Sequence, residues 1–163
     1  MTAVTYRVPS AVLTEREHVV PLDHSKPDGP KITVFSRELA HPDGLDKPYL
    51  IFQQGGPGFE ATRPTAPPSG WQKRAIADYR VLLIDQRGVG RSTPVADIPG
   101  DDPEAQAEYL THFRADSIVR DAELIRQDRF EATRTHCLLG GAGDLRDQDL
   151  GVWQCLREVV VVS

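Results

Sequence analysis

Residues 49–58 read YLIFQQGGPG, and residues 81–92 read VLLIDQRGVGRS. Each stretch is a short, continuous apolar run that ends in a glycine-rich turn. Such runs are typical of strands that are buried on both faces of a parallel sheet. Between them lies a proline-rich loop, and a short helix is expected over Trp71–Ala77. The order strand, helix, strand is a crossover connection, which predicts an α/β fold with a mostly parallel sheet flanked by helices.

Composition limits the classes of function that the chain can have. With 163 residues, 39% of them apolar and 26% charged, the chain fits one globular domain. A net charge of −5 and the lack of a Lys/Arg cluster argue against nucleic acid as a partner. The apolar runs are far shorter than a membrane span, and no secretory leader is recognisable. We therefore expect no membrane partner and a cytoplasmic location.

The remaining elements are expected on both sides of these two strands. A hairpin is predicted from a strand at 18–22 and a second strand at 31–38, joined by a turn-rich segment. Helices are expected from Asp102 toward Leu110 and over 115–126, the latter with Ile118, Ala122 and Ile125 on one face. We expect a boundary near residue 126, because all thirteen prolines precede Glu104 and both cysteines follow it.

The two parts divided by this boundary have different expected roles. Residues 1–126 are interpreted as the N-terminal half of an α/β core. Residues 127–163 are interpreted as a divergent or out-of-frame tail, with a possible strand at 135–139, a glycine turn at 140–143 and one further strand at 157–162. With these strands the sheet would have five or six strands.

The Gly-Gly-Pro-Gly turn at 55–58 has a chemical use beyond changing the chain direction. Glycine adopts a positive φ at no steric cost, so the backbone N–H groups of such a turn can converge on one point. In hydrolases with a nucleophile elbow, one donor to the oxyanion comes from a loop of this kind. The turn lacks the Gly-Lys-Ser/Thr ending of a phosphate loop. An ordinary tight loop is the alternative interpretation.

The turn at 85–92 is interpreted as a support for that loop. Arg87 is placed to reach backbone carbonyls or a carboxylate, and Asp85 ends its strand. Ser92 lies in a sequence similar to a nucleophile elbow, but Pro94 stands where the elbow needs its last glycine. Ser92 is therefore expected to be a turn or capping residue.

Several of these motifs, in the same order, resemble the prolyl aminopeptidase (proline iminopeptidase) family of serine peptidases with the α/β-hydrolase fold. The resemblance covers about residues 16–126 and is carried by 50–59, 63–64, 70–71, 79–94 and 109–123. It implies an incomplete α/β-hydrolase fold and a peptide substrate with an N-terminal proline or another residue. It also implies that Gly55 and Gly56 line the oxyanion hole, with support from Gln54, Pro57, Gly58, Asp85 and Arg87. No cofactor and no metal are implied.

The catalytic residues of that family are not found in this chain. Where the resemblance places a serine elbow, the sequence reads Gly140-Gly141-Ala142-Gly143, and the catalytic Asp and His have no room before Ser163. His136 and Cys137 are adjacent, and neighbouring strand residues point to opposite faces, so a Cys–His pair is not expected. Asp144, Asp147 and Asp149 lack the glycine and distal glutamate of a calcium loop.

Three hypotheses about function remain open at this point. The first is a truncated or frame-shifted prolyl aminopeptidase fragment that is inactive alone, which the coding DNA beyond codon 126 would test. The second is a non-catalytic, hydrolase-like domain that binds a peptide or a partner. The third is part of a related esterase whose serine comes from another chain. The sequence fixes no oligomeric state under any of the three.

Overall fold

The computed structural model describes residues 3–54, 58–95, 98, 100–129, 135–140 and 159–162. Within these residues, seven strands form one mixed sheet in the order β1-β2-β3-β5-β4-β6-β7. The strands are β1 (Ala3–Val8), β2 (Ala11–Pro21), β3 (Lys31–Ala40), β4 (Tyr49–Gln54), β5 (Arg80–Asp85), β6 (Thr135–Gly140) and β7 (Val159–Val162). The helices are α1 (Gly70–Ala75), α2 (Pro103–Thr111) and α3 (Ala115–Arg129).

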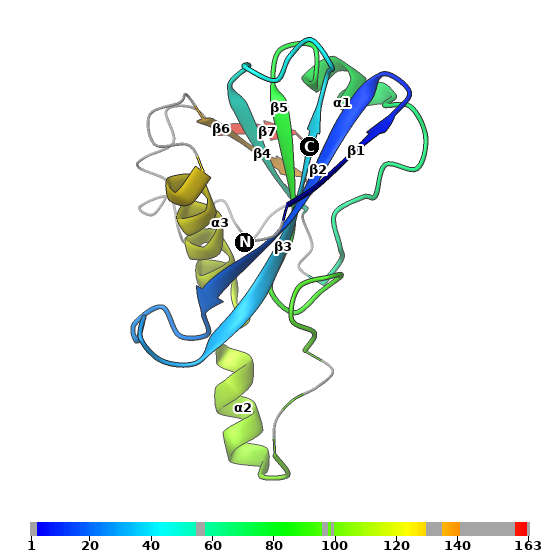
Figure 1. Ribbon diagram of the computed structural model, residues 1–163. Coiled ribbons are helices and arrows are strands. Elements are labelled where there is room, and N and C mark those ends of the chain that lie inside the picture. Colours follow the sequence, from blue (N-terminus) through cyan, green and yellow to red (C-terminus); the bar gives the residue numbers. More distant parts are fainter. Residues whose placement is uncertain are drawn as a thin grey trace.

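The pairing of the strands changes from antiparallel to parallel across the sheet. Strands β1, β2, β3 and β5 pair antiparallel in succession, whereas β4 is parallel to both β5 and β6, and β6 is parallel to β7. The expected parallel pair of apolar strands is confirmed at the centre of the sheet, but the sheet is mixed rather than mostly parallel, because the N-terminal strands pair antiparallel up to β5. In Figure 1 the antiparallel strands β1 to β3 cross the front of the molecule, with β4 and β6 behind them.

The N-terminal hairpin is confirmed, but it is longer than the sequence predicts. Strand β2 begins at Ala11 rather than at residue 18, and β3 continues to Ala40. Strand β1 was not predicted. It pairs with β2 through a two-residue turn in which Ser10 has a φ of 67°. With this strand the sheet has seven strands instead of the five or six expected.

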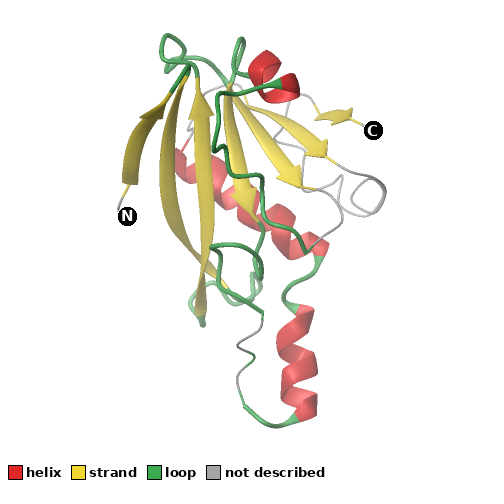
Figure 2. Cartoon of the chain, turned by 90° about the vertical axis from the view of Figure 1, so that its right-hand side faces the viewer, coloured by secondary structure: helices red, strands yellow, loops and turns green. Residues whose placement is uncertain are grey.

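Each face of the sheet has its own apolar core. One core joins the alternate residues of β2 to β5 to the apolar face of α3, which includes Val119, Ala122 and Ile125. The other core joins the opposite face to Ile76, just after α1, and to Ala61. Figure 2 shows α3 lying along one face of the sheet and α2 extending beyond its end. The predicted buried positions Ile118, Ala122 and Ile125 are confirmed, each with at most 4% exposure.

Helix α2 begins where the sequence predicts. The side chain of Asp102 accepts a hydrogen bond from the amide of Glu104, and Pro103 occupies the first turn, where its missing N–H costs nothing. No helix in the described parts of the chain is long and apolar enough to cross a bilayer. The domain boundary near residue 126 stays a prediction.

Candidate active-site scaffold

The loop that follows β4 is anchored at both of its ends by two consecutive residues. At the near end, the Gln86 amide nitrogen donates to the carbonyl of Gln54 at 2.8 Å. At the far end, the backbone N–H of Ala61 donates to Asp85 Oδ1 at 3.0 Å. Asp85 and Gln86 are both buried. Gln54 and Ala61, which flank the expected oxyanion loop, are thus both held by the end of β5.

Within that loop, Gly58 has a φ of 125°, a conformation that favours glycine. Gly55, Gly56 and Pro57 lie outside the described residues. Their assignment to the oxyanion hole and its support therefore stays a prediction.

Asp85 also holds the loop that follows β5. Its second carboxylate oxygen, Oδ2, accepts the backbone N–H of Arg91 at 3.0 Å. Gly90 has a φ of 58°, and a Cβ built there would lie 2.4 Å from the same oxygen. Only glycine allows the carboxylate to approach this closely, so the Gly90 backbone and the Asp85 side chain fit as a pair.

Ser92 has the structural role that the sequence predicts for it. Its hydroxyl donates to the carbonyl of Asp85 at 2.6 Å and accepts the backbone N–H of Phe35 at 2.9 Å. With 1% exposure and both contacts to backbone, Ser92 joins the β5 loop to β3.

Arg87 makes a saturated set of hydrogen bonds in the interior. Its Nε and Nη2 donate to the two oxygens of Asp121 at 2.7 and 2.6 Å. The remaining N–H groups reach the carbonyls of Pro21, Leu22 and His112 at 3.1, 2.9 and 2.6 Å. These are the carbonyl and carboxylate contacts that the sequence suggests for Arg87. They tie the end of β2, the end of α2 and helix α3 to the β5 loop.

The hydrogen bonds of Arg87 indicate which ring nitrogen of the neighbouring His24 carries a proton. His24 Nε2 lies 2.9 Å from Asp121 Oδ1 and 3.0 Å from Arg87 Nη2. Because both Nη2 protons already have oxygen acceptors, Nε2 itself carries a proton and donates it to Asp121. His24 therefore adds a hydrogen bond to the carboxylate and ties the hairpin turn to α3.

A second polar cluster lies on the other face of the sheet, around Glu15. Its carboxylate accepts hydrogen bonds from Tyr6 at 2.9 Å, Arg37 at 3.0 Å and Arg91 at 2.6 Å. Burial pushes the pKa of Glu15 upward, but these hydrogen bonds outweigh it and hold the pKa below its usual value. Through Arg91, this cluster connects β1, β2 and β3 to the loop that Asp85 holds.

Two buried glutamines near the carboxyl ends of β4 and β5 have unsatisfied polar atoms. Within the described part of the chain, neither polar atom of the Gln53 side chain has a hydrogen-bond partner, and neither has Gln86 Oε1. Both residues have at most 2% exposure. Gln53 is not among the site residues expected from the sequence. The feature that could have indicated it is its polar side chain at a position where the apolar run predicts a buried residue.

The residues considered and set aside from the sequence fall mostly in the C-terminal part. His136 and Cys137 occupy consecutive positions of β6, whose backbone alone is described. Gly141, Ala142 and the three aspartates from 144 to 149 lie outside the described residues. Among the residues that are described, no group of three or more His, Cys, Asp or Glu side chains could hold a metal ion.

Comparison with known proteins identifies the relatives of this scaffold. The chain is 58% identical over 113 residues to the proline iminopeptidase of Aeromonas sobria, covering 66% of this chain and 26% of that protein. It is 37% identical over 119 residues to the proline iminopeptidase aneH of Aspergillus aculeatus, covering 69% of this chain and 26% of that protein. The N-terminal part of the chain is homologous to proline iminopeptidases. The chain spans about a quarter of the length of these proline iminopeptidases. No family model matches the sequence.

Solved structures with low sequence identity show the fold. Homoserine O-acetyltransferase from Staphylococcus aureus superimposes with a TM-score of 0.58 at 16% identity, covering 91% of this chain and 46% of that one. An epoxide hydrolase mutant from Vigna radiata gives a TM-score of 0.50 at 16% identity, covering 91% and 38%. The described sheet and helices therefore form part of an α/β-hydrolase-like fold, in agreement with the homology to proline iminopeptidases.

Proposed function

We propose that this chain supplies the oxyanion-loop half of a serine hydrolase site of the proline iminopeptidase type. The observation that carries the proposal is the loop between Gln54 and Ala61, anchored at one end by Gln86 and at the other by Asp85. The sequence resemblance to proline iminopeptidases over about residues 16–126 includes this loop and both of its anchors. The proposed substrate is a peptide with a free N-terminus, preferably with proline as its first residue. The cytoplasm is the proposed location.

The two anchors would matter for catalysis because they hold the loop that supplies the oxyanion donors. When an acyl group is attacked, negative charge develops on the carbonyl oxygen, and backbone N–H groups from the loop would stabilise it. A single donor of this kind is worth about 3 kcal/mol of barrier, provided that it is held in place before the reaction. Asp85 and Gln86 are positioning residues in this proposal, since they hold the loop and touch no reacting atom. Gly55 and Gly56 are the proposed donors.

The nucleophile is proposed to lie outside the described scaffold. The sequence Gly140-Gly141-Ala142-Gly143 stands where the resemblance expects a serine elbow. Gln53 and Gln86 have buried polar atoms without a partner among the described residues, which supports a site completed by further residues, because buried polar groups almost always have partners. We therefore expect the chain alone to form no acyl-enzyme.

Labelling the full chain with a serine-directed fluorophosphonate tests this expectation. The proposal predicts no labelled residue and no hydrolysis of proline 4-nitroanilide, with the Aeromonas sobria enzyme as the positive control. A labelled serine in this chain would show a nucleophile that the proposal omits. The replacement of the expected elbow favours a second candidate, a non-catalytic domain that binds a peptide. Saturable binding of a proline-initiated peptide without hydrolysis would support that candidate.

A further inference from the structure

Arg91 connects the loop after β5 to two carboxylates at once. Its backbone N–H donates to Asp85 Oδ2 at 3.0 Å, and its Nη1 donates to Glu15 Oε2 at 2.6 Å. Asp85 ends β5, whereas Glu15 lies on β2, and β3 separates these two strands. The side chain of Arg91 therefore reaches across β3. It ties the outer part of the sheet to the carboxylate that also holds the loop after β4.

An aromatic ring beneath this side chain helps to fix its direction. Phe35 of β3 is the register partner of Asp85, and its side chain is fully buried. The guanidinium carbon of Arg91 lies 4.0 Å from the centroid of the Phe35 ring. A guanidinium over an aromatic face gains a cation–π attraction, which adds here to the ion pair with Glu15. The ring and the carboxylate together favour one orientation of Arg91, although its side chain is 47% exposed.

Glu15 is itself held in place by two further donors. The Tyr6 hydroxyl and Arg37 Nε both donate to Oε1, at 2.9 and 3.0 Å, while Oε2 accepts from Arg91. The Glu15 and Arg37 side chains are 11% and 3% exposed, so solvent screens this pair little. The second carboxylate near Arg91, that of Glu17, lies 3.9 Å from Nη2 and is 62% exposed. Glu15 is therefore the closer and better fixed of the two anionic partners.

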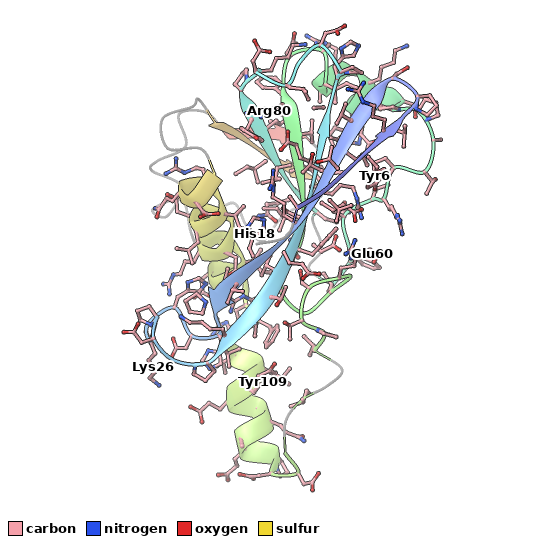
Figure 3. All side chains as sticks on the ribbon, viewed as in Figure 1. Tyr6, His18, Lys26, Glu60, Arg80 and Tyr109 are labelled. Atoms are coloured by element: carbon pink, nitrogen blue, oxygen red, sulfur yellow. The ribbon has the colours of Figure 1, made fainter. Side chains whose placement is uncertain are left out.

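The loops after β4 and β5 also pass close to each other. A Cβ built on Gly90 would lie 2.8 Å from the Cβ of Glu60, so the residue before Arg91 adjoins the residue before Ala61. In Figure 3, Tyr6 and Glu60 lie on the same side of the sheet, away from α3. A displacement of Arg91 would therefore reach the Ala61 N–H in two ways, through the shared carboxylate and through this close approach.

We propose that Arg91 and the ionised carboxylate of Glu15 are positioning residues for the loop that follows β4. They hold the Arg91 backbone against Asp85, and Asp85 in turn holds the Ala61 N–H. Loss of the Glu15 charge leaves Arg91 with the more distant and more exposed Glu17, and the loop loosens. The catalytic consequence rests on the proposed function, in which this loop supplies the oxyanion donors. The effect on the loop itself can be measured in the full chain without any turnover.

Amide hydrogen exchange in the full chain near neutral pH tests this proposal. The amide of Ala61 reports on the loop, and the amide of Ala122 in the core under α3 reports on global unfolding. We expect Arg91→Ala and Glu15→Gln each to speed the exchange of Ala61 relative to Ala122 by about fivefold or more. The matched control is Glu17→Gln, which removes the same charge from the same strand. It should change this ratio by less than about twofold.

Two further variants separate positioning by charge from a general loss of packing. Arg91→Lys keeps the positive charge, so the Ala61 amide should exchange more slowly in this variant than in Arg91→Ala. The double variant Glu15→Gln/Arg91→Ala should exchange at Ala61 about as fast as either single variant, because both substitutions break the same contact.

The pH dependence of the exchange tests the role of the Glu15 charge. The difference in Ala61 protection between wild type and Glu15→Gln should be constant near neutral pH. It should shrink as the pH falls through the folded pKa of Glu15, which lies below 4.5. The other charged or titratable groups that face this carboxylate are present in both proteins and cancel in the difference; they are Tyr6, Arg37, Arg91 and Glu17.

Several outcomes would overturn the proposal. They are equal Ala61 exchange in the Glu15→Gln and Glu17→Gln variants, additive effects in the double variant, Arg91→Lys exchanging as fast as Arg91→Ala, and a difference that does not change with pH. A wild-type Ala61 amide that exchanges only as slowly as Ala122 would also overturn it, because the loop would then open only on global unfolding. None of these results bears on acyl-enzyme formation or hydrolysis, so a failure here is distinguishable from a failure of the proposed function.

Discussion

The buried carboxylate of Asp85 accepts the backbone N–H of Ala61 at 3.0 Å, and so a side chain at the end of β5 fixes the loop that leaves β4. The same carboxylate accepts the N–H of Arg91, so one residue sets two loops relative to each other. A carboxylate has two oxygens for two such donors, whereas an amide has one. The loop geometry therefore depends on the charge state and chemistry of this single side chain.

Replacing Asp85 with Asn should leave one of the two backbone amides without an acceptor. Because a buried, unsatisfied amide costs about 1–3 kcal/mol, we expect Asp85→Asn to lower the free energy of unfolding by that amount. Urea titration of the full chain measures this loss, and Asp46→Asn on an exposed turn is the control. A loss equal to that of the control would contradict the role assigned to Asp85.

Gly90→Ala should destabilise the chain more than Gly100→Ala. Both glycines have a positive φ, 58° and 79°, so an alanine costs about 1–2 kcal/mol of backbone strain at either position. At Gly90 the new Cβ also collides with the Asp85 carboxylate, whereas at Gly100 no atom of the described residues lies within 4 Å. We expect an additional loss of about 1 kcal/mol or more at Gly90 in urea titration. Equal losses would mean that the β5 loop can move away from Asp85.

Arg87→Lys should be far from conservative. Lysine keeps the charge but loses the planar fork that reaches Asp121 and three carbonyls together. We expect a loss of at least about 2 kcal/mol in the free energy of unfolding. The control is Arg74→Lys, whose ion pair with Asp78 is exposed and should change stability by less than about 0.5 kcal/mol. Similar effects of the two variants would contradict the bracing role of Arg87.

The Glu15 cluster should make stability depend on acid pH. The pKa of Glu15 in the folded chain lies below its usual value of 4.5, so its contribution is fully present above that pH. The contribution is lost as the pH falls through the folded pKa. The difference in unfolding free energy between wild type and Glu15→Gln should therefore be constant near neutral pH and shrink in the acid range. Urea titrations at a series of pH values measure this difference. A difference that does not change with pH would contradict the stabilising role of the ionised Glu15 carboxylate.

Much of the fold follows from local sequence patterns. The apolar runs that form β4 and β5, the cap at Asp102 and the buried stripe of α3 each carry a strong signal. Strand β1 was missed because its alternating residues are mostly exposed, which weakens the apolar signal. The early start of β2 was missed because Thr14, Glu15 and Arg16 are polar. These residues form strands because they pair with residues distant in the sequence, and a local sequence pattern does not reveal such partners.

Less of the candidate site than of the fold could be predicted from the sequence. The sequence indicated that Arg87 reaches a carboxylate and carbonyls, but it did not identify Asp121, which is 34 residues away. The two anchors of the β4 loop were also not foreseen as a pair. Gln86 holds a carbonyl 32 residues earlier, and only the parallel pairing of β4 and β5 brings the two together. Long-range hydrogen bonds of this kind depend on the register of the sheet.

A chimaera with the Aeromonas sobria proline iminopeptidase tests the central claim most directly. In this chimaera the matched N-terminal region of this chain replaces the homologous region of that enzyme, which supplies the rest of the site. The account predicts a folded chimaera that hydrolyses proline 4-nitroanilide, with Asp85→Asn lowering kcat while KM changes little. A chimaera that folds cooperatively but shows neither fluorophosphonate labelling nor hydrolysis would contradict the claim that this chain carries a competent oxyanion half.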